Sequence, residues 1–170
     1  EEAIWRRRSS KISKTPQTLN RTSASTVPIP HMPTKELILN FIKKHIIGVL
    51  ATATPDGMPE AAVIEFAETE DLELIFDTFT TYRKYKNLKN NPRVAFVIGW
   101  DENITVQYEG IAEELSGENL NKYKKIYFTK NPDAQKWQKF KETTWFKITP
   151  KWVRYRDGNT MPPTEREISF

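Results

Sequence analysis

Short segments of β-branched and apolar residues recur along the chain from Ile46 to Arg156, and turns or polar stretches separate them. The first two segments flank Pro55-Asp56-Gly57, where glycine supplies the positive φ that a tight hairpin needs. The predicted strands are Ile46–Thr54, Ala61–Phe66, Leu72–Thr78, Arg93–Trp100, Ile104–Leu115, Trp145–Thr149 and Trp152–Arg156. Many short strands joined by turns favour an antiparallel barrel.

Helical spacing of apolar residues interrupts this β pattern. The predicted helices surround Leu37–Ile42 and cover Tyr82–Asn91, Asn119–Phe128 and Pro132–Lys141. Pro92 ends the second of them, because the residue before a proline disfavours helical backbone. We therefore predict a mainly β (α+β) fold, in which six to seven antiparallel strands form a barrel and the helices pack outside it.

Charge is distributed unevenly between the N-terminal segment and the rest of the chain. Residues 1–31 hold six of the 26 basic side chains and two of the 22 acidic ones, so they carry the whole net charge of +4. We expect this segment to be a disordered tail or a cloning-derived extension. It is rich in Ser, Thr, Pro and Arg, with almost no apolar periodicity, so it cannot bury enough surface to order itself. The sequence Pro30-His31-Met32 also resembles a vector junction. Residues 32–170 form the predicted domain. A basic arm that binds nucleic acid or a membrane is the alternative for the tail, but the neutral domain argues against nucleic acid as a partner.

Several classes of protein are excluded by residues that the sequence lacks. There is no cysteine, so disulfides, thiolate metal sites and cysteine nucleophiles are ruled out. The longest apolar run, Ile46–Ala51, is too short to cross a bilayer, and the start of the sequence does not resemble a signal peptide. We expect a cytoplasmic protein with no metal site and with His45 in a structural role at the end of the first helix.

The stretch from Leu74 to Val94 carries the strongest chemical signal. A strand delivers Thr78, a short loop follows, and Arg83 and Lys84 stand in the first turn of a helix. A hydroxyl, a guanidinium, an ammonium group and free helix N–H groups together suit a dianionic phosphate. The alternative interpretation is a solvated basic face of the helix.

The order of these motifs resembles the pyridoxamine 5′-phosphate oxidase-like family over most of residues 40–158. The resemblance rests on the Thr78 loop, Arg83-Lys84, Asn87–Val94, Glu109–Ala112 and Phe146–Pro150, followed by Asp157-Gly158. It implies a split β-barrel that forms a homodimer and binds FMN at the subunit interface. Some branches of the family bind a deazaflavin or haem instead. The resemblance also implies a small-molecule substrate.

The resemblance assigns cofactor-binding roles to individual residues of this chain. Thr78, Arg83 and Lys84 would hold the FMN phosphate, with Tyr82 at the position of a serine in the oxidases. Val63 and Ile64 would lie against the flavin ring, and Thr105 would approach it from the partner subunit, where the oxidases have a glutamine. Trp100 ends a strand near the expected cofactor mouth, and its alternative role is in the core or at the dimer interface.

Two departures from the family pattern affect the predicted ligand. The oxidases have an arginine and a lysine in the second strand, where this chain has Ala61 and Phe66, so we expect weaker or reorganised FMN binding. Gly158–Phe170 lacks the Arg-x-His-Asp substrate segment and contains Arg166 as its only basic residue. The sequence therefore predicts a substrate other than pyridoxamine phosphate.

Three functional hypotheses follow from the sequence. The first is an FMN-dependent oxidoreductase that acts on an unidentified small substrate, with no side chain that stands out as a catalytic acid or base. The second is a non-catalytic flavin or haem binding or storage protein of the same fold. The third is a nucleic-acid binder that uses the basic tail.

Overall fold

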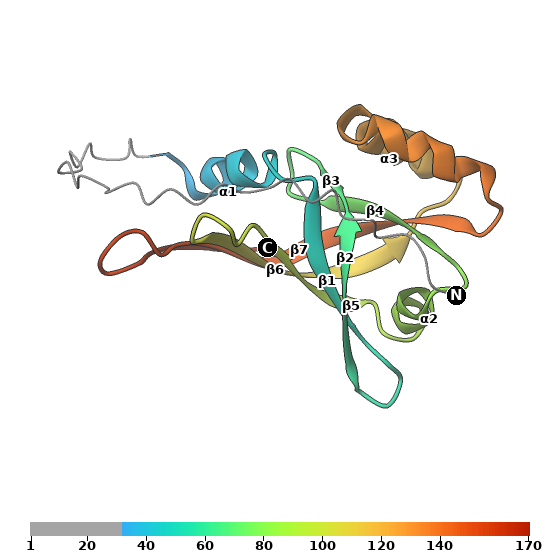
Figure 1. Cartoon of the computed structure of the whole chain (residues 1–170), viewed down its shortest axis with the longest axis horizontal. Helices are drawn as coiled ribbons and strands as arrows, with labels where there is room; N and C mark the ends of the chain where they lie inside the picture. Colours follow the sequence, from blue (N-terminus) through green and yellow to red (C-terminus); the bar gives the residue numbers. More distant parts are fainter. Residues whose placement is uncertain (1–31) are drawn as a thin grey trace, which may run out of the picture. The chain divides into compact units, whose positions relative to one another are not determined.

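The computed structural model of the protein describes residues 32–170, which form one curled antiparallel sheet with helices around it (Figure 1). The strands are β1 Ile47–Ala53, β2 Pro59–Glu65, β3 Ala67–Glu68, β4 Leu74–Phe79, β5 Arg93–Ile98, β6 Ile104–Glu114, β7 Thr143–Asp157 and β8 Thr164–Ser169. The helices are α1 Thr34–Ile42, α2 Arg83–Asn90, α3 Gly117–Lys130 and the 3₁₀-helix η1 Pro132–Lys139. The predicted tail, residues 1–31, lies outside the described residues.

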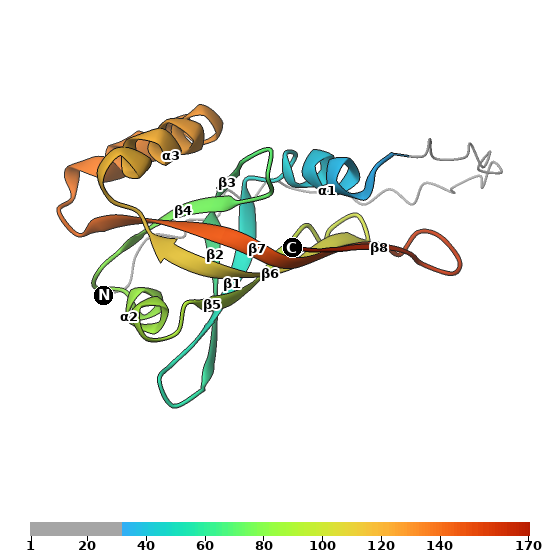
Figure 2. The same cartoon turned by 180° about the vertical axis from the view of Figure 1, so that it is seen from behind.

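The strand order explains how the sheet curls. Neighbouring strands run β2-β1-β5-β6-β7-β4-β3, and β8 pairs with β7 outside this path. Strand β7 pairs with β4 through its first half and with β8 through its second half, while β6 accompanies it along both (Figure 2). The mainly β, antiparallel split-barrel prediction is therefore confirmed.

The predicted break at Pro150 is wrong, because β7 continues through it. A β-bulge absorbs the proline: Gly110 of β6 pairs with Pro150, whereas Glu109 pairs with Trp152. Gly110 is required at this crossing, since a Cβ atom there would lie 2.6 Å from both Ile148 Cγ2 and Thr149 O. The two predicted C-terminal strands are thus one long bent strand.

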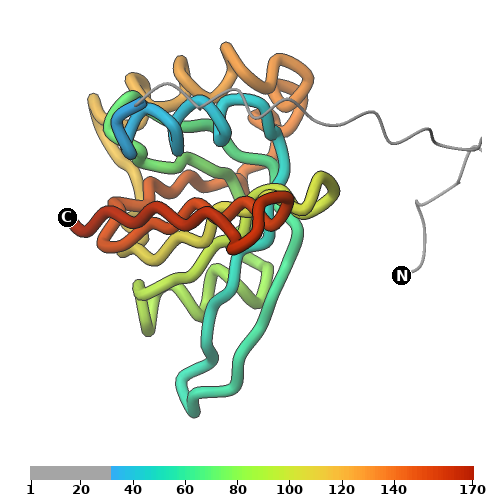
Figure 3. The backbone as a smooth tube through the Cα atoms, turned by 90° about the vertical axis from the view of Figure 1, so that its left-hand side faces the viewer, coloured from blue at the N-terminus to red at the C-terminus, as the bar shows by residue number. Residues whose placement is uncertain are grey.

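Two hydrophobic cores hold the helices against the sheet. The larger lies inside the curled sheet and includes Phe66, Phe96 and Tyr108; α1 contributes Ile38 and α2 contributes Leu88. The smaller lies beneath α3 and contains Ile75, Tyr123, Tyr127, Ala134 and Trp145. In Figure 3 both α1 and α3 lie at the top of the view, while α2 and the β1–β2 hairpin lie at the bottom.

Several local predictions were confirmed and others were not. The hairpin turn has Gly57 at φ +89°, as the sequence predicts. His45 follows α1 with its ring 4.4 Å from that of Phe41, consistent with a structural role. The helix predicted over Pro132–Lys141 is a 3₁₀-helix over Pro132–Lys139, whereas β3 and β8 were not predicted. None of the helices between residues 32 and 170 is long and apolar enough to cross a membrane.

Candidate functional site

The site is built where β4 passes through a short loop into α2. Strand β4 ends at Phe79, and Tyr82 precedes the helix with an extended backbone. No side chain among residues 32–170 caps the first turn of α2, so N–H groups of this turn are available to a ligand. The ring of Phe79 packs edge-on against those of Tyr82 and Trp137, at centroid distances of 5.1 and 6.4 Å. These rings form an aromatic wall beside the loop.

A hollow of about 250 Å³ adjoins this loop. It is lined by Ile64, Glu65, Asp77, Thr78, Phe79, Tyr82, Lys84 and Trp137. Thr78 is buried, and its Oγ has no hydrogen-bond partner among residues 32–170. A buried hydroxyl without a partner is unfavourable, so this one is available to hydrogen-bond a ligand in the hollow.

Asp77 and Lys84 line the same hollow and carry opposite charges when both are ionised. Burial lowers the pKa of Lys84, and the charge of Asp77 partly offsets this effect. Burial raises the pKa of Asp77, while the hydroxyl of Tyr127, which donates to Asp77 Oδ1 at 3.0 Å, works in the opposite direction. Lys84 Nζ also lies 4.7 Å from the centre of the Tyr82 ring. The lysine is thus a partly buried cation that is available to an anionic ligand.

A second hollow, of about 550 Å³, lies on the β2 side of the same loop. It is lined by Leu50, Thr52, Pro59, Glu60, Ala61, Ala62, Thr81, Tyr82, Arg83 and Lys84. The guanidinium of Arg83 forms an ion pair with the carboxylate of Glu60. Tyr82 and Lys84 line both hollows and therefore connect them.

Four of the predicted site residues come together around the first hollow. These are Ile64, Thr78, Tyr82 and Lys84. Arg83 borders only the second hollow and is paired with Glu60 rather than free. Val63, Trp100 and Thr105 line neither: Val63 is 62% exposed on β2, Trp100 is 49% exposed after β5, and Thr105 is half-buried on β6.

Asp77 and Glu60 are two of the lining residues that the sequence did not predict. Asp77 carried a usable signal, because it is the one acid within the apolar strand Leu74–Phe79. Glu60 carried none, since β2 also contains Glu65 and nothing local distinguishes the two. Ala61 of β2 lines the second hollow, and Phe66, which directly follows β2, lies in the core, so neither of these two positions supplies a cation.

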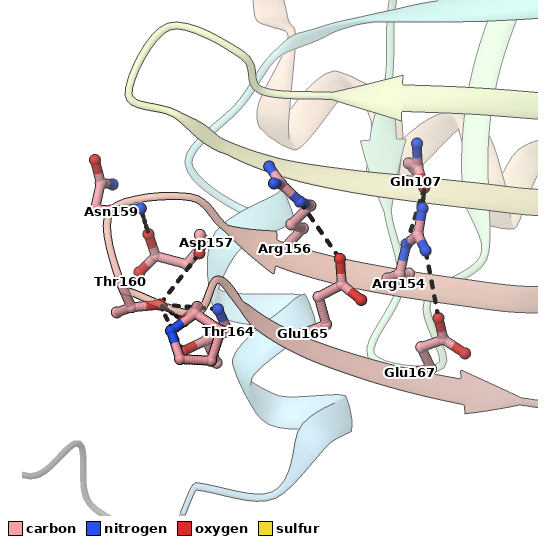
Figure 4. A network of polar contacts seen from close by, with 10 residues as sticks. Gln107, Arg154, Arg156, Asp157, Asn159, Thr160, Thr164, Glu165 and Glu167 are labelled. Atoms are coloured by element: carbon pink, nitrogen blue, oxygen red, sulfur yellow. Dashed lines mark hydrogen bonds and ion pairs between the residues drawn. The ribbon is translucent and has the colours of Figure 1, made fainter.

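The outer face of the sheet carries a continuous row of cross-strand neighbours. Val63, Val49 and Val97 lie opposite one another on β2, β1 and β5. The row continues through Gln107, Arg154 and Glu167 on β6, β7 and β8. Figure 4 shows this polar half, in which Arg154 Nε donates to Gln107 Oε1 at 3.0 Å and Arg154 Nη1 lies 3.7 Å from a Glu167 carboxylate oxygen. This row is therefore apolar on β2, β1 and β5, and polar on β6, β7 and β8.

Comparisons with known proteins agree on the family. The sequence model of pyridoxamine 5′-phosphate oxidase matches residues 34–157. A pyridoxine/pyridoxamine 5′-phosphate oxidase of Ehrlichia ruminantium is 32% identical over 102 residues, which are 59% of this chain and 51% of that protein. The chain thus spans about half the length of that relative.

Solved structures support the fold. A haem-binding protein from Mycobacterium smegmatis aligns with a TM-score of 0.73 at 17% identity, covering 83% of this chain and 60% of that one. HutZ, the haem storage protein of Vibrio cholerae, aligns with a TM-score of 0.59 at 15% identity, covering 71% and 92%. These likenesses concern the fold alone, whereas the sequence match extends over most of the described domain. The chain therefore belongs to the pyridoxamine 5′-phosphate oxidase-like family.

Proposed function

We propose that the protein binds FMN in the two connected hollows and acts as an oxidoreductase on a small substrate. One observation carries this proposal: the buried Thr78 hydroxyl has no partner among residues 32–170 and lines a hollow together with Lys84. The uncapped first turn of α2 adds N–H donors at the same place. A hydroxyl, an ammonium group and backbone N–H groups fit a flavin phosphate, so the residues present suit the cofactor.

The residues of the chain supply binding and orientation, while bound FMN would supply the transfer of a hydride or electrons. Thr78 and Lys84 would hold the phosphate, and Ile64 with the aromatic wall would offer an apolar surface to the ring system. Asp77 is the residue best placed to hold a proton in the hollow, because burial raises the pKa of its carboxyl.

A second copy of the chain would complete the site. Val63, Val49 and Val97 form an apolar strip on the outer face of the sheet, and Val63 is 62% exposed. An apolar strip that is partly exposed in this way fits a protein partner, and members of this family are commonly dimeric. We propose a homodimer in which Val63, Thr105 and Trp100 approach the cofactor at the interface. We place its activity in the cytoplasm.

The proposal is tested by FMN titration of variants in the first hollow. Thr78→Val removes the unpaired hydroxyl at nearly constant volume, and Lys84→Gln removes the cation. Because each charge-assisted hydrogen bond contributes about 1.5–3 kcal/mol, we expect Lys84→Gln to weaken FMN binding about tenfold or more. Thr78→Val should weaken it by a smaller factor.

The matched control is Lys86→Gln, which removes a cation from the same helix at a position that lines neither hollow. It should bind FMN as the unaltered protein does. Equal FMN affinity in all four proteins would refute the site, and absence of FMN binding by the unaltered protein would refute the function.

A non-catalytic binding protein is the second candidate. The pairing of Arg83 with Glu60 favours it, since it leaves fewer cations for a phosphate than the oxidases have. Two structural neighbours are a haem-binding and a haem storage protein, which makes haem the alternative ligand. Oxidation of a reduced nicotinamide by the flavin-loaded protein separates the candidates: an oxidoreductase should turn over repeatedly, whereas a carrier should not. A haem absorption spectrum after haem addition would favour the carrier.

A further inference from the structure

Glu60 places a carboxylate in the second hollow, which is also lined by Lys84, one of the two residues proposed to hold the phosphate. Its side chain is 15% exposed, whereas that of its partner Arg83 is 82% exposed. The carboxylate is therefore the fixed member of the pair, and the guanidinium reaches over it from the solvent side. A surface salt bridge between two mobile side chains would have little effect, but this pair has one anchored partner.

Buried hydrogen bonds hold the Glu60 carboxylate in place. Asn87 Nδ2 of α2 lies 2.7 Å from Glu60 Oε2 and 3.0 Å from Thr52 Oγ1 of β1. Asn87 and Thr52 are both buried. The carboxylate is thus connected to two further elements, α2 and β1, and is not free to leave when an anionic ligand approaches.

The second carboxylate oxygen depends on Arg83. Glu60 Oε1 is buried, and its one close partner in the described domain is the Arg83 guanidinium. If Arg83 turned toward a ligand phosphate, this oxygen would be left charged, buried and unpaired, which is unfavourable. The phosphate would also approach a fixed negative charge. Both effects oppose a dianionic group bound at Lys84, which borders this hollow as well as the first.

We propose that Glu60 determines which flavin the site prefers, by reducing the advantage of the phosphate of FMN over the terminal hydroxyl of riboflavin. The inference rests on the proposed flavin function. Glu60 acts through the charge it adds and through the guanidinium it holds, so it is a specificity-determining residue and has no role in redox chemistry. The absence of cations at Ala61 and Phe66 acts in the same direction.

The test compares the affinities of FMN and riboflavin for the unaltered protein, Glu60→Gln and Glu60→Ala by fluorescence titration. Glu60→Gln keeps an acceptor for Asn87 but removes the charge and releases Arg83. We expect the ratio of the riboflavin Kd to the FMN Kd to rise about tenfold, with the riboflavin Kd nearly unchanged. Glu60→Ala should raise the ratio in the same direction.

The matched control is Glu114→Gln, because Glu114 also pairs with a cation of α2, Lys89 Nζ at 3.0 Å, but lines neither hollow. It should leave the ratio unchanged. Partial unfolding of a variant would weaken both flavins equally, so the ratio still reports on Glu60. Flavin binding with an unchanged ratio in both Glu60 variants would overturn this inference alone. Failure of the unaltered protein to bind either flavin would overturn the proposed function as well.

Discussion

At the residue scale, the site is defined by polar groups that the apolar core does not satisfy. Thr78 has a buried hydroxyl without a partner in the described domain, and Asp77 is an acid in an otherwise apolar strand. Glu60 carries a buried oxygen that depends on one guanidinium. Groups of this kind weaken a fold unless a ligand or a counter-charge compensates them, and they therefore point to function.

Asp77 makes a pH-dependent contribution to stability. Burial raises the pKa of Asp77 above its ordinary value of 3.8. A carboxyl with a higher pKa in the folded state binds its proton more tightly when folded, so the free energy of unfolding falls as pH rises from 3.8 through the folded-state value. We expect Asp77→Asn to be more stable than the unaltered protein at neutral pH, with the difference vanishing below pH 3.8.

Urea unfolding across this pH range measures the effect. Asp56→Asn is the control of opposite sign, because a hydrogen bond from Thr54 lowers the pKa of Asp56. Its native state favours the ionised form, so this variant should lose stability at neutral pH and the loss should vanish in acid. A stability difference for Asp77→Asn that does not vary with pH would contradict the assignment.

At the element scale, the crossing of β6 over β7 depends on a glycine. A Cβ atom at Gly110 would lie 2.6 Å from Ile148 Cγ2 and from the Thr149 carbonyl oxygen, opposite the bulge at Pro150. The carbonyl belongs to the backbone and cannot rotate away, so we expect Gly110→Ala to lower the free energy of unfolding by roughly 1–3 kcal/mol. Denaturant unfolding measures this, with Glu109→Ala, an exposed neighbour on β6, as the control. Equal stabilities for the two variants would show that the bulge adapts more readily than its geometry implies.

At the scale of the whole molecule, the proposed homodimer would bury the apolar strip on the outer face of the sheet. Val63 is exposed in the apolar half of this face, so a charge there should leave the protomer folded but disfavour burial against a partner. We expect Val63→Lys to convert a dimer into a monomer and to weaken FMN binding in parallel, because the proposed site is completed by the second copy. Sedimentation velocity and FMN titration measure the two effects.

Met161→Lys is the matched control, since Met161 is 95% exposed in the turn between β7 and β8. It should change neither association nor FMN affinity. Retention of the dimer by Val63→Lys would exclude this half of the face from the interface. Loss of the dimer with unchanged FMN affinity would show that one protomer holds the cofactor alone.

The sequence by itself determined the features that arise from local interactions. Runs of β-branched and apolar residues and the glycine at position 57 are sufficient to predict the β1–β2 hairpin, and the segment from Leu72 to Pro92 predicts a strand, a loop and a basic helix in that order. It also placed Thr78, Tyr82 and Lys84 together, because they are close in the chain and the loop between β4 and α2 is short.

The position of Glu60, the formation of β8 and the continuity of β7 depend on contacts between distant segments, so only the tertiary structure decided them. Glu60 meets Asn87 across 27 positions of sequence, and no local pattern indicates that β2 would bring this carboxylate to the start of α2. The polar sequence of β8 has little strand signal of its own, and the strand forms because β7 offers it a free edge. The continuity of β7 through Pro150 likewise requires the bulge opposite Gly110. Strand pairing and ion pairing depend on which surfaces meet, and that is settled only when the sheet curls and closes its core.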